Sequence, residues 1–110
     1  MASTIKIASF NHVKDFTYVK DKLYILGGIN PRVELFQEMD GQWDQCTNDT
    51  SYKHSLFAFN DTVAYFSKSK GVNHWVTGFG KSQKTALISE QGEIKSPIVY
   101  PDNSLGFLWD

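Results

Sequence analysis

The chain repeats one pattern, an apolar strand, a polar turn and a second apolar strand, about every 40 residues. Residues 16–26 align with residues 56–66 at an offset of 40, and the turns 20–21 and 60–61 coincide. A shorter third copy over residues 100–108 follows the second at an offset of 42. An internal repeat constrains the architecture before any single residue does, because each copy has to form a similar unit.

The secondary structure predicted from the sequence is entirely β. Helical periodicity is absent, whereas short aromatic and β-branched runs alternate with Gly, Asn, Asp and Ser. Most connections are short enough to join antiparallel neighbours. With 15% aromatic and 21% charged residues, we expect one compact domain over residues 1–110, with blade-like units at about 15–50, 55–90 and 96–110. Strands are predicted at 5–10, 15–19, 23–26, 33–36, 55–59, 63–66, 74–77, 85–89, 98–100 and 105–109.

Residues 15–43 resemble one repeat of the kelch family of β-propellers. The strand Lys22-Leu23-Tyr24-Ile25-Leu26 ends in Gly27-Gly28, an aromatic residue follows at Phe36, and Trp43 comes seven positions later. The resemblance implies that the glycines permit close backbone approach and that Phe36 and Trp43 pack between blades. The second copy departs from this pattern, with Ser67-Lys68 in place of the glycines and Gln83 in place of Trp.

The chain has material for about two and a half such units, and a closed propeller takes at least four. We therefore expect antiparallel, propeller-blade-like sheets that form a partial propeller or an open sandwich. A ring built from several copies is the alternative, and a plain antiparallel sandwich or meander also fits the pattern.

Several classes of function do not fit the sequence. No HExxH, GxSxG or Walker motif occurs, and none of the three histidines lies in a short motif with a nucleophile or a carboxylate pair. Cys46 is the only cysteine, so neither an internal disulfide nor a Cys/His metal cluster is expected. The formal charge of -1 argues against direct nucleic-acid binding. We predict no enzyme, no cofactor and no metal.

The expected localisation is the cytoplasm. The N-terminal residues lack the apolar run of a signal peptide, and no stretch approaches the roughly 18 apolar residues that cross a bilayer.

Charge is segregated along the chain. Residues 33–50 contain five acidic residues and no Lys or Arg, whereas residues 62–89 contain four Lys and no acidic residue. Solvated loops would explain this pattern; an acidic docking face for a basic protein, with aromatic anchors, would explain it as well. Trp43 fits either an anchor or a core residue. The predicted partner-binding residues are Glu34, Phe36, Glu38, Asp40, Trp43 and Asp44.

These features favour a non-enzymatic protein-binding domain. In general character the chain resembles the immunity proteins that neutralise polymorphic bacterial toxins, which implies a monomer that occludes a cognate toxin, such as a basic nuclease. The alternative is a lectin assembled from several copies, in which Trp43 and Trp75 stack on a sugar. Against the lectin, the three Trp are spaced 32 and 34 residues apart rather than 40.

Overall fold

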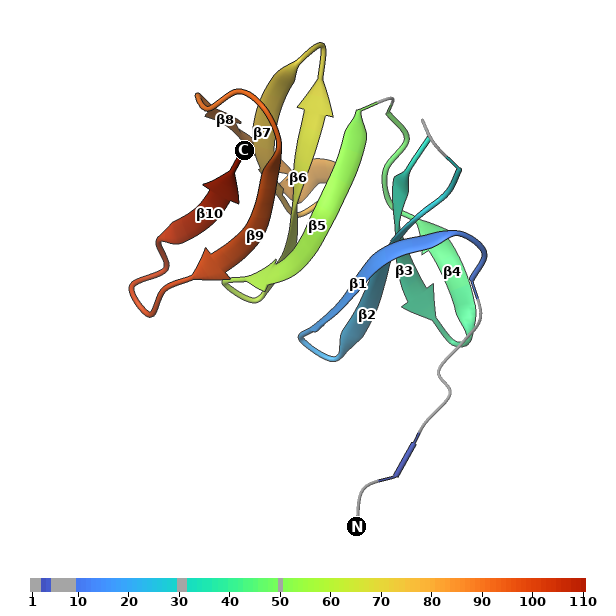
Figure 1. Ribbon diagram of the computed structural model, residues 1–110. Helices are drawn as coiled ribbons and strands as arrows, with labels where there is room; N and C mark the ends of the chain where they lie inside the picture. The colour runs from blue at the N-terminus through green and yellow to red at the C-terminus, as the bar shows by residue number, and fades with distance from the viewer. Residues whose placement is uncertain (1–2, 5–9, 30–31, 50) are drawn as a thin grey trace.

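Ten strands form three antiparallel sheets in the computed structural model, which describes residues 3–4, 10–29, 32–49 and 51–110 (Figure 1). The predicted all-β, antiparallel fold is confirmed. Sheet A contains β1 (Val13–Val19), β2 (Lys22–Gly27), β3 (Glu34–Met39) and β4 (Gln42–Gln45). Sheet B contains β5 (Tyr52–Phe59), β6 (Thr62–Ser69), β7 (Val72–Thr77) and β8 (Lys84–Ile88), with a 3-10 turn η1 (Gly80–Ser82) before β8. Sheet C contains β9 (Ile94–Val99) and β10 (Leu105–Trp109).

Each sheet is a meander in which neighbours in sequence are neighbours in space. The first hairpins of sheets A and B turn through Lys20-Asp21 and Asn60-Asp61, and all four residues have positive φ, between 49° and 63°. Two consecutive positive φ values define a type I′ turn, whose twist matches that of the flanking strands. The turns predicted from the repeat are therefore present.

The sheets stack face to face, with sheet B in the middle (Figure 1). Successive residues of a strand point to opposite faces, and β6 uses both of its faces. Val63 and Tyr65 pack against sheet A in one apolar cluster, and Phe66 packs against sheet C in another. The first strands of the sheets lie next to one another, since β5 contacts both β1 and β9. The described residues do not close into a ring.

Two strands differ from the sequence prediction or fall outside its test. Strand β4 was not predicted, because its sequence, Gln42 to Gln45, contains no β-branched residue; pairing with β3 along one edge makes it a strand. The predicted strand 5–10 lies outside the described residues, except for Phe10. Among the described residues, no helix is long and apolar enough to cross a membrane.

Candidate binding groove at the end of sheet A

An open groove of about 430 Å³ lies where the β1–β2 and β3–β4 turns meet. The two hairpins bring its residues together from positions about 20 apart in the sequence. The lining combines three apolar side chains with three carboxylates: Tyr18, Leu23 and Met39 with Asp21, Glu38 and Asp40. Lys22 and Gln37 complete it.

Local contacts position the polar groups of the groove. Glu38 accepts a hydrogen bond from the backbone N–H of Gly41 (3.2 Å), which braces the β3–β4 turn. The hydroxyl of Tyr18 donates to Asp21 Oδ1 (3.3 Å), and desolvation together with this carboxylate raises the pKa of Tyr18. Within the described part of the chain, neither Glu38 nor Asp40 forms an ion pair. These charges are therefore available to a partner.

Strand β4 extends the acidic surface beyond the groove. Asp44 is exposed and lies opposite Gln37 in the β3–β4 ladder, and Trp43 lies opposite Glu38. Met39 is 49% exposed beside them. Glu38, Asp40, Trp43 and Asp44 thus lie at the same end of sheet A, but Asp44 shares the face of Gln37, whereas Trp43 shares that of Glu38. That these residues bind a partner stays a prediction.

Phe36 and Trp43 lie in an aromatic cluster of the chain itself. The ring centroid of Phe10 is 4.8 Å from that of Phe36 and 5.6 Å from that of Trp43. Both Phe36 and Trp43 are half-buried. Because intramolecular packing already engages these rings, Met39 is a better placed apolar contact for a partner than either of them.

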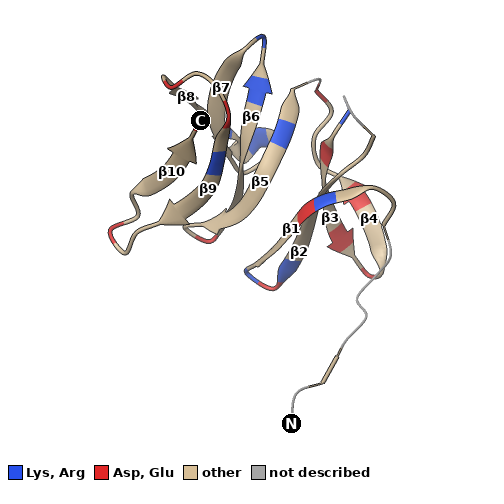
Figure 2. Cartoon of the chain, viewed as in Figure 1, with Lys and Arg blue, Asp and Glu red and all other residues tan. Residues whose placement is uncertain are grey.

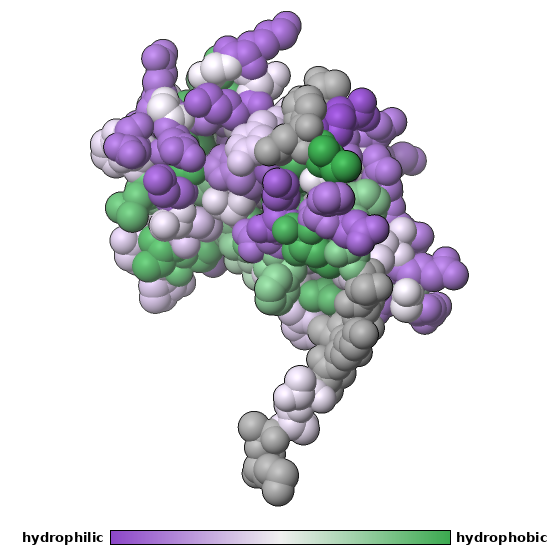
Figure 3. All heavy atoms as spheres, turned by 45° about the vertical axis from the view of Figure 1, so that its right-hand side comes forward, coloured by the Kyte–Doolittle hydropathy of each residue, from purple (hydrophilic) through white to green (hydrophobic). Residues whose placement is uncertain are grey.

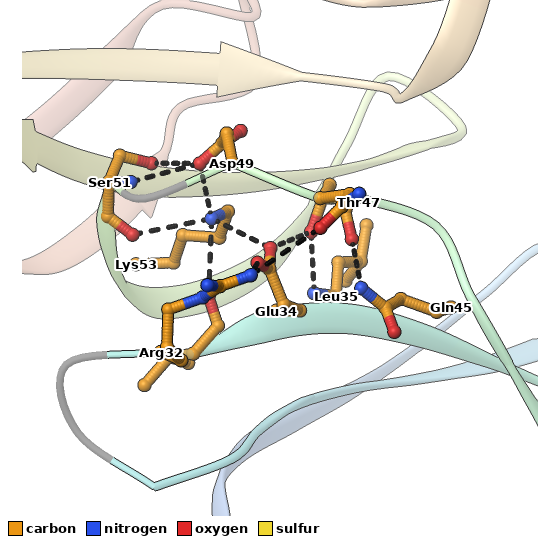
Figure 4. A network of polar contacts seen from close by, with 10 residues as sticks. Arg32, Glu34, Leu35, Gln45, Thr47, Asp49, Ser51 and Lys53 are labelled. Atoms are coloured by element: carbon orange, nitrogen blue, oxygen red, sulfur yellow. Dashed lines mark hydrogen bonds and ion pairs between the residues drawn. The ribbon is translucent and has the colours of Figure 1, made fainter.

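Glu34 is placed differently from the other predicted residues. It begins β3 whereas Asp40 follows its end, so about 20 Å of extended strand separates them. Glu34 is only 5% exposed, and its Oε1 lies 3.0 Å from Nζ of Lys53 (Figure 4). A carboxylate paired inside the protein cannot face a partner, so the expected role of Glu34 in the acidic face does not fit its position.

Lys53 is the centre of this buried polar network (Figure 4). Its fully buried ammonium group pairs with Asp49 (2.6 Å) as well as Glu34, and donates to the carbonyl oxygens of Val33 (3.1 Å) and Ser51 (3.3 Å). Burial alone would raise the pKa of Asp49, but hydrogen bonds from Lys53 and Ser51 outweigh burial and lower it. The network ties the start of β3 to β5, and so joins sheet A to sheet B.

The sequence analysis missed Lys53, Tyr18, Leu23 and Asp21. Regular alternation would place Lys53 and buried Leu56, three residues apart, on opposite faces, and only the bulge between His54 and Phe57 brings them to the same side. The sequence pattern therefore gave no signal for Lys53. The other three lie on the neighbouring hairpin, and only the sheet register shows that this hairpin ends beside β3.

A second hollow, of about 640 Å³, lies between sheets B and C. The rings of Tyr52 and His54 stack there with centroids 5.4 Å apart, and burial lowers the pKa of His54. Lys68 and Asn73 also line it, but both already donate hydrogen bonds to the backbone carbonyl of Gly92. Most of its polar lining is thus engaged within the chain.

The tryptophans proposed for a lectin site do not meet. Trp43 lies on β4 of sheet A, whereas Trp75 lies on β7 and joins the cluster between sheets B and C. The Trp75 ring packs edge-on against Phe59 with centroids 5.0 Å apart.

Cys46 does not have the properties of a nucleophile. Burial, and then the charge of Asp44, raise its pKa to about 11, so the thiol keeps its proton at neutral pH. Among the described residues, no group of three His, Cys, Asp or Glu side chains is arranged to hold a metal ion.

Comparison with known proteins gives no relative: no family model, no curated protein and no solved structure matches the chain.

Proposed function

We propose that the protein is a non-enzymatic protein-binding domain that uses the acidic groove of sheet A to bind a basic partner. The observation that carries the proposal is the cluster of Asp21, Glu38 and Asp40 around exposed apolar side chains, joined by Asp44 on β4. Carboxylates that form no ion pair among the described residues raise the rate of encounter with a basic protein, and apolar contacts then slow dissociation.

The acidic residues are concentrated in one part of the molecule. Figure 2 shows acidic positions on β3 and β4, whereas Lys is found on β5, β6 and β9 and, within sheet A, on β1 and β2. This polarity supports an oriented approach of a cationic surface to sheet A.

The specific form of the proposal is an immunity protein that blocks a toxin by occlusion. The carboxylates of Glu38, Asp40 and Asp44 pair with the Lys and Arg side chains that a nuclease uses for its substrate, and Met39 is the apolar contact. The proposed scaffold is a partial, kelch-like propeller: the 40-residue repeat, the four-stranded meanders and their face-to-face stacking support it.

The test uses paired substitutions that remove the same charge. In Asp40→Asn with Asp44→Asn, the positive φ of residue 40 (52°) is tolerated by Asn, so the fold is retained. The matched control is Asp61→Asn with Glu90→Gln, outside the groove. The probe is a purified basic nuclease of the proposed class, with its association rate measured at low and moderate salt and with growth rescue on co-expression.

We expect the Asp40/Asp44 variant to associate about 10-fold more slowly at low salt and to lose most of its salt dependence. The Asp61/Glu90 control should associate like the unmodified protein. Equal association rates for the two variants would show that the groove does not bind the partner.

Carbohydrate binding by an oligomeric, lectin-like assembly is the second candidate function. The observation in its favour is the Tyr52 ring, which is 45% exposed at the mouth of the hollow between sheets B and C and can stack on a sugar. A glycan array would show binding that Tyr52→Ala abolishes; an array without binding excludes the glycans that it displays.

A further inference from the structure

We propose that copies of this chain associate head to tail, with the outward face of sheet A in one copy packed on the outward face of sheet C in the next. The head face is the surface of sheet A directed away from sheet B, with Phe16, Tyr18, Leu23, Ile25 and Phe36. The tail face is the surface of sheet C directed away from sheet B, with Ile98, Tyr100 and Leu108. The head face shares Tyr18 and Leu23 with the acidic groove, but the inference is argued from the repeat and does not depend on the proposed function.

The head face is the repeat equivalent of a surface that is covered inside the chain. Phe16, Leu23, Ile25 and Phe36 correspond, at an offset of 40, to Leu56, Val63, Tyr65 and Val76. The ladders agree, because Ile25 pairs with Phe36 as Tyr65 pairs with Val76. All four residues of sheet B are buried against sheet A. The head face therefore has the pattern of a surface that receives a preceding sheet.

Exposure shows which part of the head face is open. Leu56 is 7% exposed under sheet A, whereas its equivalent Phe16 is 66% exposed. Tyr18 on the same strand is 63% exposed. Phe10 covers the part near Phe36, so the open part lies along β1. Figure 3, with this side turned forward, shows hydrophobic side chains that reach the surface among polar ones.

The tail face completes a second series of equivalent residues. Leu26, Phe66 and Leu108 follow one another at offsets of 40 and 42. Leu26 lies under sheet B and Phe66 lies under sheet C, and both are 0% exposed. Leu108 is 63% exposed because no sheet covers it among the described residues. The tail face thus has the pattern of a surface that the next sheet covers.

Joining the two faces between copies would repeat an interface that the chain already makes twice. In the contact of sheet A with sheet B, Leu26 packs in one cluster with Val63 and Tyr65. In the proposed contact, Leu108 of one copy meets Leu23 of the next, the equivalent of Val63, beside exposed Phe16 on β1. Ile25, the equivalent of Tyr65, is only 6% exposed and adds little to this contact. A sheet stack that continues across copies buries the same kind of apolar surface.

Charge gives only a slight preference for the head-to-tail arrangement. Apart from the internal network of Glu34, Asp49 and Lys53, residues 10–49, which carry the head face, contain four Lys and Arg against five Asp and Glu, and residues 51–110 contain five of each. Lys95 on β9 is half-exposed beside Leu108 on the tail face. Contact between a slightly acidic head and a neutral tail that exposes a Lys is therefore preferred to contact between two heads. Because such an interface joins two different surfaces, it leads to a closed ring or an open chain of copies.

The test is the molar mass of the whole chain, measured by light scattering after size exclusion over a range of concentrations. We expect a mass that rises above 12.5 kDa with concentration. Phe16→Lys and Leu108→Lys each place a charge in the proposed contact and should raise the dissociation constant about 30-fold or more. Both residues are more than 60% exposed, so neither substitution should affect folding, which circular dichroism checks.

A mixture of the two variants provides the decisive measurement. The Phe16→Lys chain keeps its tail and the Leu108→Lys chain keeps its head, so equal amounts should form a dimer that does not grow further. Leu87→Lys, at an exposed position of β8 outside both faces, should associate like the unmodified chain.

Four results would overturn the proposal. They are a monomeric unmodified chain at about 100 μM, a mixture that stays monomeric, a Leu108→Lys chain that still associates alone, and loss of association in Leu87→Lys. The Asp40/Asp44 variant should keep the mass of the unmodified chain, so failure of this proposal and failure of the acidic groove are observed separately.

Discussion

Removing Lys53 is the most direct test of what holds sheet A to sheet B. Lys53→Met keeps the length and apolar stem of the side chain and removes its ammonium group. Glu34, only 5% exposed, then loses the cation 3.0 Å from its Oε1. Removing one partner of a buried ion pair costs about 3–5 kcal/mol, because the other charge is left without compensation.

The remaining contacts place the cost near the lower end of this range. Thr47 still donates to Glu34 Oε1 (2.7 Å), and the exposed guanidinium of Arg32 lies 3.8 Å from Oε2. The Asp49 side chain is half-exposed and is hydrated when Lys53 is lost. We therefore expect a loss of about 3 kcal/mol in the free energy of unfolding. With an unfolding entropy of about 2.1 cal/mol/K per residue, Tm should fall by roughly 13 °C.

Urea unfolding followed by tryptophan fluorescence and circular dichroism measures this loss. The matched control is Lys95→Met, which removes an exposed lysine 3.9 Å from Glu93 and should cost less than about 1 kcal/mol. Replacing both Lys53 and Glu34 by Met should recover at least half of the loss, because no buried charge is then unpaired. If Lys53→Met does not fold, the double replacement still reports on the pair. A Lys53→Met chain as stable as Lys95→Met would refute the argument.

Two further predictions concern Gly28 and Cys46. Gly28 has φ +131°, and a Cβ there would collide with the carbonyl oxygen of Arg32. Gly28→Ala should therefore lower the free energy of unfolding, measured in urea, by at least about 2 kcal/mol. Gly41→Ala, where a Cβ meets nothing within 4 Å, should cost less, and equal losses in the two variants would contradict the steric argument. The Cys46 thiol has a pKa raised from 9.0 to about 11, so at pH 9 about 1% is thiolate in the folded chain against about 50% in the unfolded chain. Iodoacetamide should therefore alkylate Cys46 far more slowly in the folded protein than in the urea-unfolded chain. The free energy of unfolding should also fall as pH rises above 9, because the unfolded chain releases the thiol proton first. Equal alkylation rates with and without urea would show that burial does not protect the thiol.

The local chemistry of the sequence predicts the β architecture well. Turn residues such as Lys20-Asp21 and Asn60-Asp61 adopt the backbone that the hairpin requires, and the alternation along β6 assigns Val63 and Phe66 to opposite faces. These features depend on contacts between near neighbours in the sequence, so they are readable without the tertiary structure.

Features that depend on tertiary contacts were less predictable. β4 exists because β3 offers it an edge, although its own residues do not favour a strand. Charge counting placed Glu34 with Glu38 in one acidic face. Alternation along β3 does put both on the same side of the strand, but Glu34 is buried at its start, and only Lys53, 19 positions further along the chain, shows this. A sum of charges over a segment does not distinguish a paired carboxylate from an exposed one.

The repeat connects the interior of the protein with its surface. Where a repeat position is buried in two sheets and exposed in the third, as in the series Leu26, Phe66 and Leu108, the difference comes from the missing neighbour rather than from the residue. A Leu kept at such a position has the side chain of a core residue on a surface. Polar substitution at Leu108 should therefore be neutral for folding and costly for association, whereas the same substitution at Leu26 should unfold the chain.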